Sequence, residues 1–247
     1  MKTAVRLILM VMVVLFFAHC ASNETANSDT VKQSEIYQSY SVTYNSGEKE
    51  LTATASFRFG GANGTTLLLV KPSKVIFENE EMPNEQNIFS GTFYEINKQT
   101  TVQPEYTYTF TDCEEKPYTN NALMIPVEIS KCPETTDKSE GLTIEWSYPL
   151  QNGESIHLFI EDKNNGSATV CTNVFGATSI SLNPEDLKKL KPGEVSVYLE
   201  RENSTSLKNA THLGGNMFVK YISKKAGLKL TGPEYIPEGQ SDTAAEK

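Results

Sequence analysis

Residues 50–59 read Glu-Leu-Thr-Ala-Thr-Ala-Ser-Phe-Arg-Phe, and apolar and polar side chains alternate along them without a break. In an extended chain, the leucine, the two alanines and the two phenylalanines fall on one face, and the polar residues fall on the other. A period of two is typical of a strand that buries one face in an antiparallel sheet. This stretch therefore predicts a half-buried β-strand.

The same alternation recurs along the chain after residue 36, for example in residues 142–148, 156–160 and 195–199. Glycine and asparagine, which supply the positive φ angles of tight hairpins, cluster between these segments. Such clusters stand at residues 45–47, 60–64, 151–153 and 164–166. Short strands separated by frequent turns predict an all-β protein built as a sandwich.

The predicted strands form two groups, which we interpret as two tandem antiparallel β-sandwich domains of immunoglobulin-like size. The first covers residues 36–132 and the second residues 141–231, and a polar, proline-bearing linker at residues 133–140 joins them. Residues 232–247 are rich in proline, glycine, glutamate and small side chains. This composition predicts a disordered tail.

Two local features distinguish the second predicted domain. Residues 142–146 form an early strand that ends in the single tryptophan, and one short helix is predicted where Asn183, Pro184 and Asp186 match the start of a helix. With these features the segment resembles immunoglobulin-like or fibronectin type III modules, although the Cys…Trp…Cys order of immunoglobulins is missing. The resemblance implies a β-sandwich.

The N-terminus has the pattern of an export leader. Lys2 and Arg6 precede an apolar run at residues 7–18. This run is about twelve residues long and is too short to cross a hydrocarbon core of roughly 30 Å as a helix. Residues 1–19 therefore predict a cleaved signal peptide.

Residues 17–20, Phe-Ala-His-Cys, resemble the lipobox of bacterial lipoproteins, with histidine where the family usually has a small residue. The resemblance implies that Cys20 becomes an N-terminus carrying fatty acyl chains such as palmitate. Ala21 is not the aspartate that retains some lipoproteins at the inner membrane, which favours the outer membrane, on its periplasmic or surface side. Residues 20–35 are then expected to form a flexible tether. Ordinary leader cleavage just after Cys20 or Ser22 is the alternative.

Composition and motifs argue against several classes of function. The formal net charge is −9, which is unsuited to binding nucleic acid phosphates. Beyond the leader, His157 and His212 are the only histidines, and no nucleophile elbow, zinc-protease, phosphate-loop or dinucleotide motif is present. Residues 161–166 have a partial calcium-loop pattern that a hairpin turn explains better. We therefore expect no catalytic residues, no bound metal and no cofactor.

Three cysteines remain if Cys20 carries lipid. Cys113 and Cys132 would close a loop of about twenty residues, worth about 3 kcal/mol in the chain-entropy model. We predict this disulfide, while a bridge from Cys171 and free thiols stay open as alternatives.

Tyr106, Tyr108 and Phe110 form an aromatic stripe on one face of a predicted strand. If the stripe is exposed, Tyr106 and Tyr108 are candidate ligand-binding residues that would stack on sugars or on a partner protein. If it is buried, it belongs to the sandwich core, which is the commoner outcome. Phe159 and Phe218 fall opposite the main apolar face of their strands and are candidates for an interdomain contact.

Together these features predict a non-enzymatic, lipid-anchored cell-envelope protein with a binding or structural role. Its expected partners are the membrane, through the N-terminal lipid, and an envelope protein or a glycan. One alternative is a surface lipoprotein that binds or processes polysaccharide, and processing would need two facing carboxylates. Another is an accessory subunit of an envelope or secretion assembly, which would present a strand edge that a partner can extend.

Overall fold

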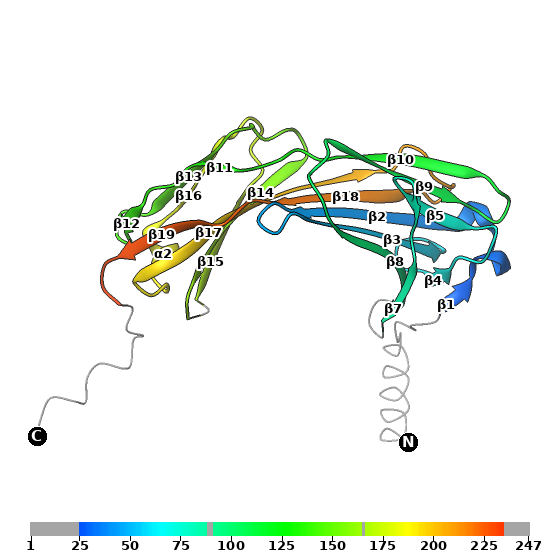
Figure 1. Cartoon of the computed structure of the whole chain (residues 1–247), viewed down its shortest axis with the longest axis horizontal. Helices are drawn as coiled ribbons and strands as arrows, with labels where there is room; N and C mark the ends of the chain where they lie inside the picture. The colour runs from blue at the N-terminus through cyan, green and yellow to red at the C-terminus, as the bar shows by residue number, and fades with distance from the viewer. Residues whose placement is uncertain (1–24, 88–90, 165, 235–247) are drawn as a thin grey trace, which may run out of the picture.

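The computed structural model describes residues 25–87, 91–164 and 166–234 (Figure 1). The predicted signal peptide at residues 1–19, Cys20 and residues 235–247 of the predicted tail lie outside the described residues. Within these ranges, no helix has both the length and the hydropathy that a membrane span requires.

One long sheet runs through the whole molecule, and two smaller sheets lie on its upper face in the view of Figure 1. The central order of the long sheet is β15 (Ser167–Thr172), β14 (Glu154–Asp162), β17 (Gly193–Ser206), β18 (Gly215–Ile222), β2 (Ile36–Asn45), β3 (Glu50–Phe59), β4 (Thr65–Leu68) and β1 (Thr25–Asn27). Its side branches are β8 (Gly91–Gln99) with β7 (Asn84–Asn87), and β19 (Ala226–Thr231) with β12 (Thr135–Asp137).

The two smaller sheets define two lobes. The first lobe carries β10 (Pro117–Leu123), β9 (Glu105–Thr111), β5 (Lys74–Phe77) and β6 (Glu80–Glu81), and the second carries β11 (Ile129–Lys131), β13 (Leu142–Trp146) and β16 (Ser179–Leu182). The molecule is thus an all-β sandwich, as the sequence predicts. It curves into an arch whose inner, concave side is the uncovered face of the long sheet (Figure 1).

The alternation predicted for residues 50–59 is present in the fold. Leu51, Ala53, Ala55 and Phe57 are buried between the sheets, while the intervening polar residues of β3 are half-buried on the other face. Strand β2 shows the same strict alternation. The core therefore lies between the long sheet and the two smaller ones.

Strand β17 joins the two lobes. Its first part pairs with β19 and β14, and its second part pairs with β18 from Glu200 onward. Strand β18 then pairs in parallel with β2, at the other end of the chain. Residues 200–222 thus complete the sheet of the first lobe, so the two predicted domains share one sheet. Their division into separate folding units stays a prediction.

Two segments predicted to be irregular are ordered. Strand β1 pairs in parallel with β4, and Gln33 is buried, donating from Nε2 to the carbonyl oxygens of Ser28 and Val31. Residues 25–35 of the tether predicted for residues 20–35 are therefore held against the first lobe, by the pairing of β1 and by the Gln33 amide. The predicted linker contains β12, and buried Lys138 donates to the carbonyl oxygens of Lys188 and Leu190.

The predicted helix is present as α2 (Pro184–Leu187). The backbone N–H of Asn183 donates to Asp186 Oδ2 over 3.0 Å, and Leu187 is buried. Two further single turns, η1 (Ser28–Thr30) and η2 (Gln33–Glu35), precede β2.

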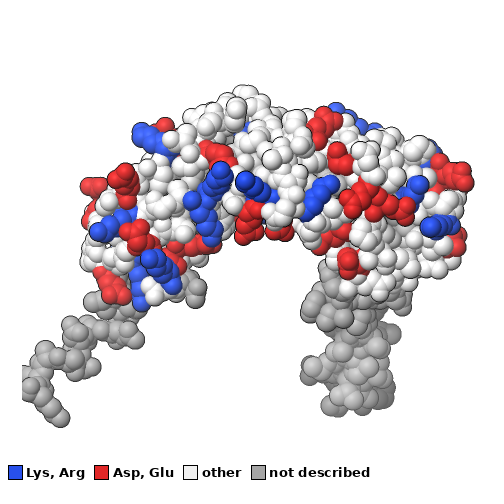
Figure 2. All heavy atoms as spheres, viewed as in Figure 1, with Lys and Arg blue, Asp and Glu red and all other residues white. Residues whose placement is uncertain are grey.

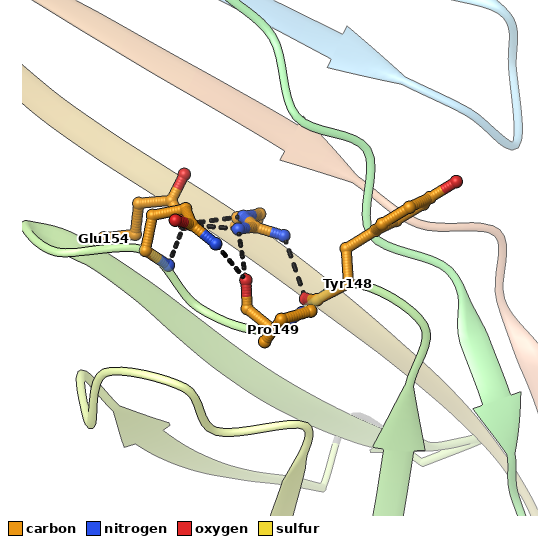
Figure 3. A network of polar contacts seen from close by, with 5 residues as sticks. Tyr148, Pro149 and Glu154 are labelled. Atoms are coloured by element: carbon orange, nitrogen blue, oxygen red, sulfur yellow. Dashed lines mark hydrogen bonds and ion pairs between the residues drawn. The ribbon is translucent and has the colours of Figure 1, made fainter.

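A buried ion pair lies where the lobes meet (Figure 3). Arg201 of β17 and Glu154 of β14 are 3% and 4% exposed, and two guanidinium nitrogens of Arg201 bond Glu154 Oε2. Arg201 also donates to the carbonyl oxygens of Tyr148 and Pro149. The pair thus links the long sheet to the loop that precedes β14.

Candidate functional site

The aromatic stripe of β9 is core. Tyr106, Tyr108 and Phe110 are at most 2% exposed, so the prediction that Tyr106 and Tyr108 bind a ligand is wrong. Tyr108 stacks on Tyr40 at a centroid distance of 4.6 Å and donates its hydroxyl to the carbonyl oxygen of Ser41 over 2.7 Å. Burial raises the pKa of Tyr108 well above its usual value. The alternative of a buried stripe is the one observed.

The predicted disulfide between Cys113 and Cys132 is also wrong, because Cys113, Cys132 and Cys171 are all free thiols. Cys113 follows the outer end of β9, where its Sγ lies 3.3 Å from Ser28 Oγ. Strand β10 then runs back along β9 for seven residues, and Cys132 follows in the second lobe. Seven residues of strand span about 20 Å, whereas a disulfide needs Cα atoms within about 7 Å of each other.

Cys171 lies beside a histidine and a carboxylate on the concave face. Its Sγ is 3.6 Å from His157 Nε2, and Glu202 Oε2 is 3.6 Å from the same nitrogen. Burial, and then the negative charge of Glu202, raise the pKa of the Cys171 thiol. A raised pKa disfavours the thiolate that a nucleophile or a metal ligand needs. In the described ranges, no three histidine, cysteine or acidic side chains gather as metal ligands.

The concave face of the first lobe carries a ladder of hydroxyl groups. Strands β2 and β3 align three cross-strand pairs there, and we name these six residues the hydroxyl ladder: Ser39 with Ser56, Ser41 with Thr54, and Thr43 with Thr52. All six are half-buried, and their side-chain hydroxyls have no hydrogen-bond partner among the described residues. Hydroxyls at a sheet face can both donate and accept. The ladder therefore offers six unused hydrogen-bonding groups in a regular array.

Aromatic and charged residues flank the hydroxyl ladder on both sides. On β18, Phe218 is aligned with Ser41 and Lys220 with Thr43. On β8, Glu95 is aligned with Thr54, and half-buried Phe93 lies two residues before it on the same face. The register thus places the polar strip between Phe218 on β18 and Phe93 on β8.

Lys220 connects this strip to β17. Its Nζ lies 2.8 Å from Glu200 Oε2 and 2.7 Å from Glu202 Oε1. Burial alone would lower the pKa of Lys220, but these two carboxylates outweigh it and raise the pKa. Figure 2 shows basic and acidic side chains next to one another along the inner curve of the arch. Two lysines of this face, Lys220 and Lys225, are both paired with carboxylates.

The second lobe places an aromatic stack on the same face. Phe159 of β14 and Tyr198 of β17 stack in parallel with centroids 4.9 Å apart. Lys225 Nζ lies 4.9 Å from the Tyr198 ring centroid and 2.9 Å from Glu161 Oε2, and the Tyr198 hydroxyl donates to Glu161 Oε1. The hydrogen bond from Lys225 contributes most to lowering the pKa of Glu161. Phe159 thus contacts a neighbouring strand of its own sheet.

The sequence interpretation missed this face. The hydroxyl residues of this face do alternate in the sequence, at positions 52, 54 and 56 and at positions 39, 41 and 43. The alternation does not specify the strand register, and only the register of β2 against β3 aligns these two sets of hydroxyl residues.

Comparisons with known proteins leave the chain without a family. No family model and no curated protein matches it. Among solved structures, the FN1–FN3 domains of chicken CNTN1 match at 12% identity, covering 74% of this chain and 64% of that one, with a TM-score of 0.23. The Bacteroides ovatus protein SGBP-B, solved with a mixed-linkage heptasaccharide, matches at 12% identity, covering 85% of this chain and 47% of that one, with a TM-score of 0.23.

A bacterial ice-binding adhesin matches at 9% identity over 81% of this chain and 66% of the adhesin, with a TM-score of 0.23. The chain thus spans less than two thirds of the length of each of these structures. Likenesses at this level give no basis for assigning their ligands to this chain.

Proposed function

We propose that the protein is a non-catalytic binding protein of the cell envelope, anchored by lipid at Cys20, and that its concave face binds a neutral oligosaccharide. The observation that carries the proposal is the hydroxyl ladder, whose six side chains lack partners in the described part of the chain. A sugar presents hydroxyls that donate and accept in the same way, and its C–H face packs on aromatic rings such as Phe93 and Phe218.

The charges near the ladder favour binding over hydrolysis. A glycosidase needs one protonated carboxylic acid beside a second carboxylate. Lys220 Nζ lies 2.8 Å from Glu200 Oε2 and 2.7 Å from Glu202 Oε1, so both carboxylates are engaged by one ammonium group. Because Lys220 is engaged by these two carboxylates, the hydroxyl ladder itself presents neutral hydrogen-bonding groups, which suit a neutral ligand.

Removing two central hydroxyls is expected to weaken glycan binding. The double variant Ser41→Ala with Thr54→Val keeps the shape of the sheet and removes two hydrogen bonds, each worth about 0.5–1.5 kcal/mol. Affinity for the best ligand on a glycan array should fall by about 5- to 150-fold, measured by calorimetry.

The matched control is Thr107→Val, which removes a hydroxyl from β9 on the opposite side of the sandwich. It should bind as the parent protein does. An array without a bound glycan, or a double variant that binds as tightly as the control, contradicts the proposal.

The lipid anchor has its own test. Changing Cys20 to alanine removes the acceptor of the acyl chains, so the exported protein should move from the membrane fraction to the soluble fraction. Immunoblots of fractionated cells measure this, with Cys171→Ala as the control that stays with membranes. A Cys20→Ala protein that still sediments with membranes argues against lipidation.

A further inference from the structure

A groove opens on the other side of the long sheet, between β10 and the β17–β18 hairpin. Its volume is about 550 Å³, within the roughly 300–1,000 Å³ usual for ligand sites. Met217 and Val219 of β18 and Ala122 of β10 form its apolar floor, and Asn203 and Thr205 line the wall formed by β17. Because Met217 and Val219 point opposite to Phe218 and Lys220 of the concave face, the groove is separate from the hydroxyl ladder.

Strand β10 presents an open backbone edge to this groove. Among the described residues its single strand partner is β9. Met124 N–H donates to Pro104 O, and Asp112 N–H donates to Lys116 O. Hydrogen-bonded and non-hydrogen-bonded pairs alternate along an antiparallel ladder.

Tyr118, Asn120 and Ala122 therefore bond β9 through their backbones. The N–H and C=O groups of Thr119, Asn121 and Leu123 point away from β9, to the free edge.

This edge begins with Pro117 but lacks the charged side chains that usually protect one. Proteins commonly place charged side chains along an exposed strand edge, yet residues 117–123 contain none. Leu123, at the end of the strand, is 61% exposed. At the opposite wall, the pairing of β14 stops at Asn203, so residues 204–206 of β17 have no strand partner on that side within the described part of the chain.

Charged residues lie at the two ends of the groove, and at one end the loop after β17 contacts β10. The Asn120 side chain exchanges two hydrogen bonds with the backbone of Asn209, through Nδ2 to the carbonyl oxygen and through Oδ1 from the N–H. Lys208 lies beside this end, and Glu105 lies opposite Leu123 at the other. The two ends thus carry opposite charges.

We propose that β10 accepts an extended strand from a partner protein. The added strand extends the smaller sheet of the first lobe and places alternate apolar side chains on Met217 and Val219. A polypeptide is the ligand that offers N–H and C=O groups at the spacing of the free edge. An antiparallel strand, as in the rest of this sheet, places a basic residue near its start by Glu105 and an acidic residue near its end by Lys208.

The experiment pans the mature chain against a phage-displayed library of linear twelve-residue peptides, and the enriched peptides are then synthesised. We expect the enriched peptides to carry alternating apolar residues, with a basic residue before them and an acidic residue after them. These peptides should bind the Asn121→Pro variant at least tenfold more weakly than the parent protein. Proline removes an N–H that points to the free edge and no backbone hydrogen bond to β9, and it also removes the side-chain hydrogen bond from Asn121 Nδ2 to Glu105 Oε1. Thr119→Pro provides a second variant of the same kind, and thermal unfolding checks both.

Hydrogen exchange by NMR locates the contact. The amides of Thr119, Asn121 and Leu123 should exchange at least tenfold more slowly when the peptide binds, while that of Asn120, already bonded to β9, should not change. No enriched peptide, equal binding to both proline variants, or protection elsewhere overturns the proposal. A dimer of the free protein that Asn121→Pro dissociates would also overturn it, in favour of self-pairing. Glycan binding should be unchanged in Asn121→Pro, which separates this result from the proposed function.

Discussion

Replacing Glu154 with alanine is expected to lower the free energy of unfolding by about 3–5 kcal/mol. The change leaves the Arg201 guanidinium, 3% exposed, without its carboxylate partner. It also removes the acceptor of the Gln151 backbone N–H, which now donates to Glu154 Oε2 over 2.7 Å. An unpaired buried charge accounts for most of the loss. Urea denaturation followed by circular dichroism measures it.

Two controls show whether burial is the cause. Glu145→Ala breaks the Lys131–Glu145 pair, whose side chains are 72% and 43% exposed, and should cost less than about 1 kcal/mol. Glu154→Met combined with Arg201→Met removes both charges and should recover part of the stability lost in the single variant. A Glu154→Ala protein as stable as the Glu145→Ala protein would show that the pair contributes little.

The strands themselves were predictable because side-chain alternation follows from the covalent geometry of an extended chain. Leu51, Ala53 and Phe57 point into the core as the sequence pattern indicates. The helix start at Asn183 was equally local, since its capping bond joins residues three positions apart. Features that depend only on residues near one another in the sequence could therefore be predicted.

Pairing over long distances was not predictable from the pattern. Residues 215–222 alternate like any other strand, and nothing in them specifies a parallel partner at residues 36–45. The same limit explains the wrong disulfide, because the separation of Cys113 and Cys132 depends on the course of β10. It also explains why the hydroxyl ladder was missed, since its pairs exist only in the register of β2 against β3.

Replacing Phe57 with alanine is expected to cost about 3–5 kcal/mol, the usual range for a fully buried phenylalanine. Phe57 is 0% exposed and contacts three other rings of the first lobe, with centroids 4.5 Å away at Phe110, 5.8 Å at Tyr94 and 6.1 Å at Tyr40. Thermal and urea unfolding measure the loss. The control Phe175→Ala, at a side chain 71% exposed, should change stability by less than about 0.5 kcal/mol.

The same variant tests whether the lobes unfold together. Trp146, the single tryptophan, is buried in the second lobe, whereas the aromatic cluster around Phe57 lies in the first. Because β17 belongs to both lobes and β18 pairs with β2, loss of the first lobe removes strand partners from the second. Phe57→Ala should therefore shift the Trp146 fluorescence transition by as much as the tyrosine signal in near-ultraviolet circular dichroism. A tyrosine transition that moves while the Trp146 transition stays in place would mean that the shared sheet does not couple the lobes, and that the two segments fold as independent domains.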